Sequence, residues 1–381
     1  MKRIGYIYEK IYDKDNIRKV IHEAAKGKTN KKVVQYILQN EEKCIQKLHD
    51  ELKNKTLKLK PSISGFIKDG PRQKERYITI PSFYPDQIVH WALMLQIQPI
   101  IAKGMYQYNC GSIPKRGTKA ARVYVERVLK KENPRYALKL DIKKFFPSVS
   151  VDKMLELFKN KIKDNDVINL IKNILDNGKP GLPIGYYTSQ WFSNFYLEQL
   201  DHFIKEQLKI PFYVRYVDDM ILFSNNKRQL HKARVAISKF LEENDYQVEI
   251  KSNWQVFQVR SRPIDFVGYK MTSKLTMVRK HIFFRVNKRA RSLSRKITLP
   301  TATSYMSLLG WLKNATNGEK YINKYLEPKI SSERIKKYIG GKAKNDLSRK
   351  GARGNRTSTT NSYHRKNSFY TQEYNSVHAT H

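Results

Sequence analysis

Three aspartates are the residues of this sequence whose type and spacing suggest chemistry. Asp218 and Asp219 are adjacent in YVRYVDDMILF, between runs of aromatic, β-branched and aliphatic residues, and Asp141 ends the run RYALKLD. Carboxylate oxygens are preferred ligands of Mg²⁺. Nucleotidyl transfer needs two divalent ions roughly 3.5–4 Å apart, one activating the attacking 3′-hydroxyl and one supporting the leaving pyrophosphate. We expect Asp141 and Asp218 to bridge such a pair of ions, with Asp219 as a supporting acid.

The same acids also have an ordinary structural explanation. The runs beside the pair favour strands, so Asp218 and Asp219 would lie at the tip of a tight β-hairpin. Asp is a common turn residue, and most Asp-Asp tips are simply solvated. Asp141 favours the catalytic interpretation, because it ends a predicted strand and is followed by a helix capped at Ser150.

Composition narrows the class of protein. The 381 residues, of which 40% are hydrophobic, can bury a core and form two or three subdomains. A net charge of +40, from 74 Lys and Arg against 34 Asp and Glu, predicts a nucleic-acid partner, with an anionic membrane surface as the alternative. No apolar run approaches the roughly 18 residues of a spanning helix, and the N-terminus lacks a signal-peptide core, so we expect a cytoplasmic protein and no membrane partner. Cys44 and Cys110 are too few for a disulfide framework or a Cys-rich zinc site, so oxygen should hold any metal.

The elements that must position the acids alternate between helical and strand-like patterns. Residues 1–60 are basic and have apolar positions at helical spacing. The strand-like stretches are RYITIPSF, RYALKLD, the two halves of the hairpin, YQVEIKSNWQVFQV and IDFVGYKM; the helical ones include DQIVHWALMLQIQPII, SVDKMLELFKNKI, WFSNFYLEQLDHFIKEQL, residues 229–244 and the chain from Arg285 to about Ile330. Residues 331–381 are rich in small polar and basic residues, which predicts a flexible basic tail.

Several blocks, in the right order, resemble those of reverse transcriptases. They are KERYITIP, LDIKKFF, GLPIGYYTSQ, YVDD, KSNWQVF and IDFVGYK, spread from about Lys74 to Lys270. The resemblance implies an α+β, right-hand polymerase fold with an antiparallel palm sheet packed on helices. It also implies the divisions 1–60 (basic N-terminal helices), 61–135 (fingers), 136–278 (palm, with a fingers insertion around 160–185), 279–330 (helical thumb) and 331–381 (flexible basic tail).

The resemblance also implies the catalytic ligands and the substrates. Asp141, Asp218 and Asp219, with the backbone carbonyl of Ile142, would bind two Mg²⁺ ions, and deoxynucleoside triphosphates would be the monomers.

Further residues would bind the incoming nucleotide. Phe146, beside Phe145, matches the aromatic residue that excludes a ribose 2′-hydroxyl; a core aromatic is the alternative. Lys74 and Arg76 match basic fingers residues that neutralise the triphosphate, although either could contact a phosphate backbone or be solvated. Lys251 is a candidate donor of a proton to pyrophosphate, with a plain surface lysine as the alternative.

The template-holding block departs from the usual Gln-Gly-x-x-x-Ser-Pro. Here it reads Ile184-Gly185-Tyr-Tyr-Thr-Ser189-Gln190, so an aliphatic side chain replaces Gln and a Gln replaces Pro. Ile184 and Gly185 are expected beside the nucleotide, and the template and primer would be held by Ser189, Gln190, Tyr216, Phe266, Gly268 and Tyr269. Since Ile can neither donate nor accept a hydrogen bond, the site should discriminate mispairs less well than one with Gln.

This departure is similar to the enzymes of diversity-generating retroelements, which are prokaryotic or phage-encoded. That resemblance implies error-prone copying of a template-repeat RNA into cDNA, with errors opposite adenine, and partners that include the RNA, the cDNA/RNA hybrid and an oligomeric, basic accessory variability protein. The alternatives are a retron, abortive-infection or group II intron-type enzyme of ordinary fidelity, in which Ile184 is only packing drift, and a non-catalytic RNA-binding protein on a polymerase fold. The last alternative predicts the loss of an acid, and all three acids are present.

Overall fold

The computed structural model describes residues 3–69, 74–176 and 178–351, which form two compact units. The first unit combines Met1–Ala121 with Arg135–Phe257, and the second combines Arg122–Pro134 with the chain from Gln258 onward. Among the described residues, no helix is both long and apolar enough to span a membrane.

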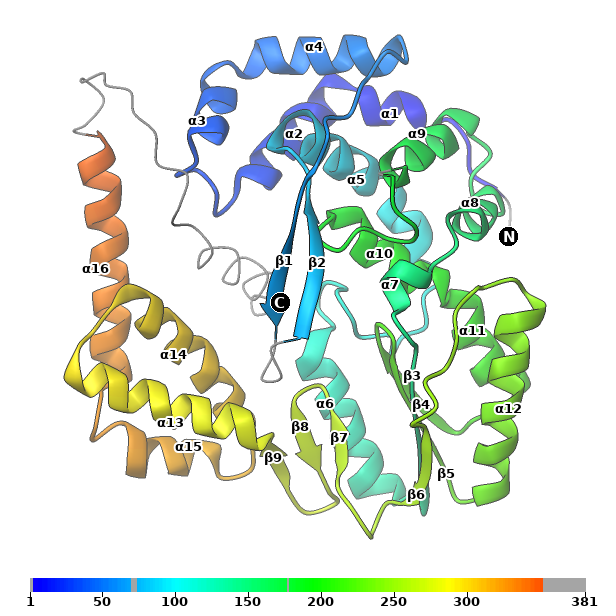
Figure 1. Cartoon of the computed structure of the whole chain (residues 1–381), viewed down its shortest axis with the longest axis vertical. Helices are drawn as coiled ribbons and strands as arrows, with labels where there is room; N and C mark the ends of the chain where they lie inside the picture. The colour runs from blue at the N-terminus through cyan, green and yellow to red at the C-terminus, as the bar shows by residue number, and fades with distance from the viewer. Residues whose placement is uncertain (1–2, 70–73, 177, 352–381) are drawn as a thin grey trace. The chain divides into compact units, whose positions relative to one another are not determined.

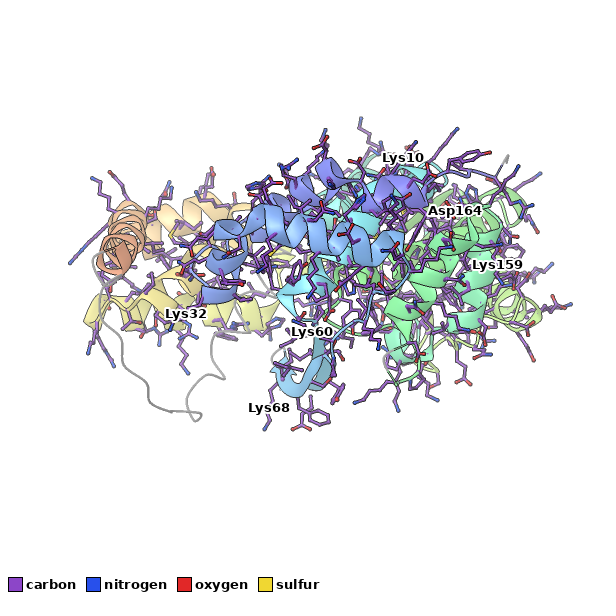
Figure 2. The ribbon with its side chains drawn as sticks, turned by 90° about the horizontal axis from the view of Figure 1, so that it is seen from above. Lys10, Lys32, Lys60, Lys68, Lys159 and Asp164 are labelled. Atoms are coloured by element: carbon purple, nitrogen blue, oxygen red, sulfur yellow. The ribbon has the colours of Figure 1, made fainter. Side chains whose placement is uncertain are left out.

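The first unit begins with helices, as the spacing of apolar residues predicts. They are α1 (Tyr8–Tyr12), α2 (Lys14–Ala25), α3 (Lys32–Gln39) and α4 (Glu41–Lys53), followed after a two-stranded ribbon by α5 (Ile88–Ala102). Asp13 caps α2 by accepting hydrogen bonds from the backbone amides of Asp15 and Asn16, which would otherwise be unpaired at a helix start. Asp164 holds the chain entering α1, because its Oδ2 accepts from the amides of Ile7 (3.1 Å) and Tyr8 (2.9 Å), and Figure 2 labels this residue.

The ribbon pairs β1 (Ile63–Asp69) with β2 (Lys74–Ile80) in antiparallel register. The sequence predicted β2, whereas β1 was not expected. Phe66 and Tyr77 face each other across the strands, with ring centroids 5.1 Å apart, and such a cross-strand aromatic pair stabilises an antiparallel ribbon.

A four-stranded sheet, in the order β4-β5-β3-β6, carries the three aspartates. Its strands are β3 (Tyr136–Asp141), β4 (Phe212–Tyr216), β5 (Asp219–Ser224) and β6 (Gln255–Gln258), and β5 is antiparallel to both β3 and β4. Helix α12 (Lys227–Glu243) packs on β3 and β5 beside α11 (Glu198–His202), as Figure 1 shows. Its buried residues Leu230, Ala233, Ile237 and Leu241 recur every three or four positions, so one apolar stripe meets the sheet. The predicted α+β class, with an antiparallel sheet packed on helices, is confirmed.

The stretch YQVEIKSNWQVFQV is less regular than predicted. Only Gln255–Gln258 forms a strand, and Ile250 makes a single bridge to Ile142. Asp245 and Gln247 have positive φ angles, which interrupt an extended strand.

The remaining helices of the first unit connect these parts. They are α6 (Gly117–Arg127, which crosses into the second unit), α7 (Phe145–Ser148), α8 (Val151–Lys159), α9 (Asn165–Leu175) and α10 (Tyr187–Tyr196), with short helical turns at Phe83–Gln87 and Phe203–Gln207; a similar turn at Val128–Glu132 belongs to the second unit. Ser150 caps α8 as predicted, since its hydroxyl accepts from the amide of Lys153.

The second unit joins a small sheet to a group of helices. The sheet comprises β7 (Ile264–Phe266), β8 (Tyr269–Met271) and β9 (Thr276–Val278), and the helices are α13 (Lys280–Arg295), α14 (Leu299–Lys313), α15 (Gly318–Tyr321), a turn at Ile322–Leu326 and α16 (Ser332–Gly351). The sheet and the helices of this unit are in contact, because Tyr269 packs on Trp311 of α14 and its hydroxyl donates to the Trp311 carbonyl.

Helix α16 begins within 331–381, the segment for which the sequence predicts a flexible basic tail. Ile335 is fully buried, and Tyr338 and Ile339 pack on the same apolar cluster. Their helical spacing gives this otherwise polar segment enough apolar surface to dock. The rest of the predicted tail, 352–381, lies outside the described residues.

Candidate metal and nucleotide site

The antiparallel register brings the three predicted acids together. Asp141 ends β3 directly opposite Asp219, the first residue of β5, and the pairing of Tyr216 with Asp219 leaves Val217 and Asp218 as a two-residue turn. Directly opposed residues of an antiparallel pair have side chains on the same face of the sheet, with Cβ atoms about 5 Å apart. The two strands therefore carry the carboxylates of Asp141 and Asp219 to one end of the sheet, next to the turn that holds Asp218.

Burial and nearby negative charge raise the pKa values of Asp218 and Asp219. Burial raises the pKa of Asp218 to about 6, and the negative charge of Asp141 adds to the rise. Burial raises the pKa of Asp219 to about 7, opposed by Lys139 and reinforced by Asp141 and Asp218. A cluster of acids whose pKa values are raised in this way favours a cation that would relieve the repulsion.

Two lysines supply positive charge to this cluster. The ammonium group of Lys251 lies 2.5 Å from Asp141 Oδ1, and the amide of Lys251 donates to the Asp141 carbonyl at 2.8 Å. Lys139 lies 3.3 Å from Asp219 Oδ2. Lys139 is not among the predicted site residues, although its position two residues before Asp141 puts both on one face of β3.

The three acids can coordinate Mg²⁺ only together with ligand atoms from the substrate and water. Among the side chains that the structure describes, no group of three His, Cys, Asp or Glu residues is arranged so that it could hold a metal ion by itself. Mg²⁺ in enzymes of phosphoryl transfer is usually held by one or two carboxylates together with water and substrate phosphates, so a complete protein cage is not required. Asp219 Oδ1 is buried and has no hydrogen-bond partner among the described residues, which leaves an acceptor at the acid cluster unsatisfied.

Aromatic and basic residues expected at the nucleotide differ in their placement. Phe145 is buried in the core at 3% exposure, whereas Phe146 is half-buried and packs on it edge to face. The positive charge of Arg76 partly opposes the rise in the pKa of Asp218, so Arg76 acts electrostatically on this acid. Lys74 begins β2, but its side chain lies outside the described part of the chain.

The template block is attached to the ribbon. The amide of Thr79 in β2 donates to the Ile184 carbonyl at 2.7 Å. Gly185 has φ +115°, and a Cβ there would lie 2.5 Å from the Thr79 carbonyl oxygen, so this close approach requires glycine. Ser189 is buried in α10, and its hydroxyl has no partner within the described residues. The neighbouring Gln190 is half-buried, and so is Tyr216 at the end of β4.

The other predicted primer residues belong to the second unit. Phe266 and Tyr269 are buried at the facing ends of β7 and β8. Gly268 lies in the turn between them, where a Cβ would overlap the Trp311 indole. These three residues form a packed turn within their own unit.

A buried polar network, none of whose residues is among the predicted site residues, contacts the Val217–Asp218 turn. Its centre is Arg215, a fully buried arginine in β4, with Asp201 and Asn194 as partners. The signal was available in YVRYV, where a charged residue interrupts an apolar strand.

Comparison with known proteins agrees with the geometry. Residues 67–271 match the family described as "Reverse transcriptase (RNA-dependent DNA polymerase)". The chain is 31% identical over 106 residues to "Retron Ec73 reverse transcriptase" of Escherichia coli, covering 24% of this chain and 34% of that protein. It is 40% identical over 82 residues to "Uncharacterized 91 kDa protein in cob intron" of Schizosaccharomyces pombe, covering 19% of this chain and 10% of that protein.

Solved structures of telomerase are more distantly similar. The structure of telomerase from Candida albicans with a fragment of telomeric RNA matches with a TM-score of 0.44 and 13% identity, over 72% of this chain and 58% of that one. Apo telomerase from Candida tropicalis matches with a TM-score of 0.43 and 14% identity, over 56% and 47% of the two chains. The family match, by contrast, spans more than half of the sequence and includes Asp141, Asp218 and Asp219. The chain belongs to the reverse transcriptase family.

Proposed function

We propose that this chain is an RNA-directed DNA polymerase that uses two magnesium ions. The observation that carries the proposal is the register that sets Asp141 opposite Asp219 beside the turn of Asp218. Asp141, Asp218 and Asp219, with the Ile142 carbonyl, would hold the ions. When bound, the ions would activate the primer 3′-hydroxyl and stabilise the charge of the leaving pyrophosphate.

The lysines at the acids have roles of their own in this proposal. Lys251 pairs with Asp141, the same carboxylate that would hold a metal ion, so its ammonium group would be displaced when the ion is bound. Once displaced, Lys251 Nζ would lie near the leaving phosphates and could give them a proton. Lys139 would balance the charge of Asp219 when no metal is bound.

Other residues would place the deoxynucleotide and the nucleic acid. Arg76 and Lys74 would neutralise the triphosphate, and Phe146 would contact the sugar. Ser189 and Gln190 would hold the template, while the turn at Phe266–Tyr269 would bind the primer. Lys10, Lys32, Lys68 and Lys159 of the first unit, which Figure 2 labels, are exposed, and such lysines can contact phosphates without reading bases. We propose the fingers, palm and thumb within 61–135, 136–278 and 279–330.

The test of polymerase function is DNA synthesis by Asp218→Ala. On an RNA template with a DNA primer, we expect synthesis to fall by about 10³-fold or more, which corresponds to about 4 kcal/mol of lost transition-state stabilisation. RNA binding should stay close to that of the parent, because this binding depends on basic residues. Asp152→Ala, which removes an exposed acid from the start of α8, is the matched control and should retain synthesis. If Asp218→Ala retained DNA synthesis, the proposal that Asp218 holds catalytic metal ions would be refuted.

For the biological role, we propose mutagenic copying of a template-repeat RNA in a diversity-generating retroelement. The block from Ile184 to Gln190 supports this role, and an oligomeric accessory protein, in a prokaryotic or phage-infected cytoplasm, would be the partner. A second candidate is a retron or group II intron-type enzyme of ordinary fidelity, which the 31% identity to the retron enzyme favours.

The two roles predict different products. Ile184→Gln should reduce misincorporation opposite template adenine by about two- to tenfold, the effect of one hydrogen bond worth about 0.5–1.5 kcal/mol. Ile184→Leu is the control and should keep the parental error spectrum. Sequencing of cDNA made with and without the accessory protein measures both. Faithful copying by the parent without that partner would favour the retron or intron-type role.

A further inference from the structure

Every nitrogen of the Arg215 guanidinium group donates hydrogen bonds within the first unit. Nε and Nη2 donate to the two carboxylate oxygens of Asp201 at 2.8 and 2.5 Å. Nη1 donates to the Val217 carbonyl at 2.9 Å and to Asn194 Oδ1 at 3.3 Å, and Nη2 donates again to the Asn194 carbonyl at 3.2 Å. All five N–H groups of the arginine are therefore engaged, and its side chain is fully buried.

The carbonyl held by Arg215 belongs to an unusual residue. Val217 has φ +57°, a left-handed conformation that is a genuine outlier for a β-branched residue and persists only where the surroundings enforce it. Gly111 packs closely against the turn, because a Cβ on Gly111 would lie 2.5 Å from Val217 Cγ2 and 2.6 Å from its amide nitrogen. The turn that presents Asp218 is thus bonded to Arg215 and in close contact with Gly111.

Asn194 extends the same network to the template block. Its Nδ2 donates to the Gly111 carbonyl at 2.6 Å and to the Gln190 carbonyl at 3.1 Å. The buried side-chain amide of Asn194, which lies in α10, therefore contacts Arg215, the Gly111 carbonyl and the Gln190 carbonyl. Helix α10 also carries Ser189 and Gln190. These contacts connect the acid-bearing hairpin to the segment expected to hold the template.

We propose that Arg215 and Asn194 are positioning residues that fix the Val217–Asp218 turn, and hence the direction of the Asp218 carboxylate, against helix α10. This inference rests on the proposed polymerase function. Neither side chain would touch a substrate, and both would act through the backbone of the turn. A network that only stabilised the core would not change the magnesium dependence of the folded enzyme, whereas a displaced Asp218 would.

Gly111→Ala tests the proposal without touching the buried ion pair. Gly111 is not among the positive-φ residues, so the added methyl group is allowed by the backbone and must displace the turn. In primer extension, we expect kcat to fall by about 10- to 100-fold, the range that a misplacement of about 1 Å can cause. The magnesium concentration for half-maximal rate should rise several-fold, while RNA affinity and the KM for the nucleotide stay near parental values. Gly340→Ala, at an exposed position of α16 with open space around it, is the control.

A second variant covers the case in which Gly111→Ala folds poorly. Arg215→Lys keeps a positive charge for Asp201 but lacks the planar fork that reaches Asp201 and Val217 together. Its folded fraction, quantified by thermal melting, should show the same change in magnesium dependence. Parental kcat and magnesium dependence in the folded fraction of both variants would overturn the inference. Asp218→Ala, assayed in parallel, separates the two levels: if it retains synthesis, the proposed function fails, and if it alone is inactive, only the positioning role fails.

Discussion

Replacing Arg215 by methionine should destabilise the first unit strongly. The change leaves the Asp201 carboxylate fully buried, with the Tyr213 hydroxyl at 2.7 Å as its remaining side-chain partner. Removing one partner of a buried ion pair costs about 3–5 kcal/mol. For a domain of roughly 150–250 residues, 1 kcal/mol corresponds to about 2–4 °C, so the melting temperature should fall by about 6–20 °C.

The double variant Arg215→Met/Asp201→Leu separates stability from activity. It removes both charges, and buried ion pairs replaced by apolar residues of similar volume often lose little stability. We therefore expect it to recover at least half of the lost melting temperature, with a coupling free energy of about 2 kcal/mol or more in the double-mutant cycle. DNA synthesis should not recover, because the Val217 carbonyl is still without its donor.

Thermal melting by circular dichroism, paired with primer extension on the same preparations, measures both properties. Arg228→Met is the control, since Arg228 is exposed at the start of α12 and should melt like the parent. If Arg215→Met melted within about 2 °C of the parent, the destabilisation reasoned from the buried pair would be refuted. Recovered DNA synthesis in the double variant would refute the inference that Arg215 positions the Val217–Asp218 turn.

Two further predictions concern the buried imidazole of His90 and the half-buried ring of Phe146. Burial lowers the pKa of His90 to about 3, so the unfolded chain takes up a proton near pH 6.5 that the folded chain does not. Between pH 7.5 and 5.0 this difference should remove about 2 kcal/mol of the free energy of unfolding. In urea titrations at the two pH values, His90→Gln should lose less than the parent, and an equal loss would contradict this role of His90. Phe146→Ala should raise the incorporation of ribonucleotides relative to deoxynucleotides by at least about tenfold, because it removes bulk expected beside the 2′-position. Unchanged discrimination in single-nucleotide extension would show that Phe146 is not the gate.

Local signals in the sequence accounted for the parts nearest the acids. Alternating and apolar runs predicted β2, β3 and the β4–β5 hairpin, and Ser150 predicted the start of α8. These elements depend on neighbours in the chain, through side-chain periodicity and capping, and so they can be predicted without tertiary contacts. The order of the motif blocks likewise indicates the reverse transcriptase family from the sequence alone.

Contacts between distant segments decided the rest. β1 needed its partner strand, and α16 formed where Ile335 could be buried against the helices of the second unit. The pairing of Lys251 with Asp141 joins residues far apart in sequence, which no local pattern encodes.

The sequence by itself determined which acids are present, the hairpin that carries two of them and the family to which the chain belongs. Tertiary structure alone decided the register of Asp141 against Asp219, the rise in the pKa values of Asp218 and Asp219, and the burial of Arg215 under a strained turn. The physical reason is that register, desolvation and charge pairing depend on which surfaces meet when the chain closes, and a buried charge is tolerated only where distant residues supply its partners.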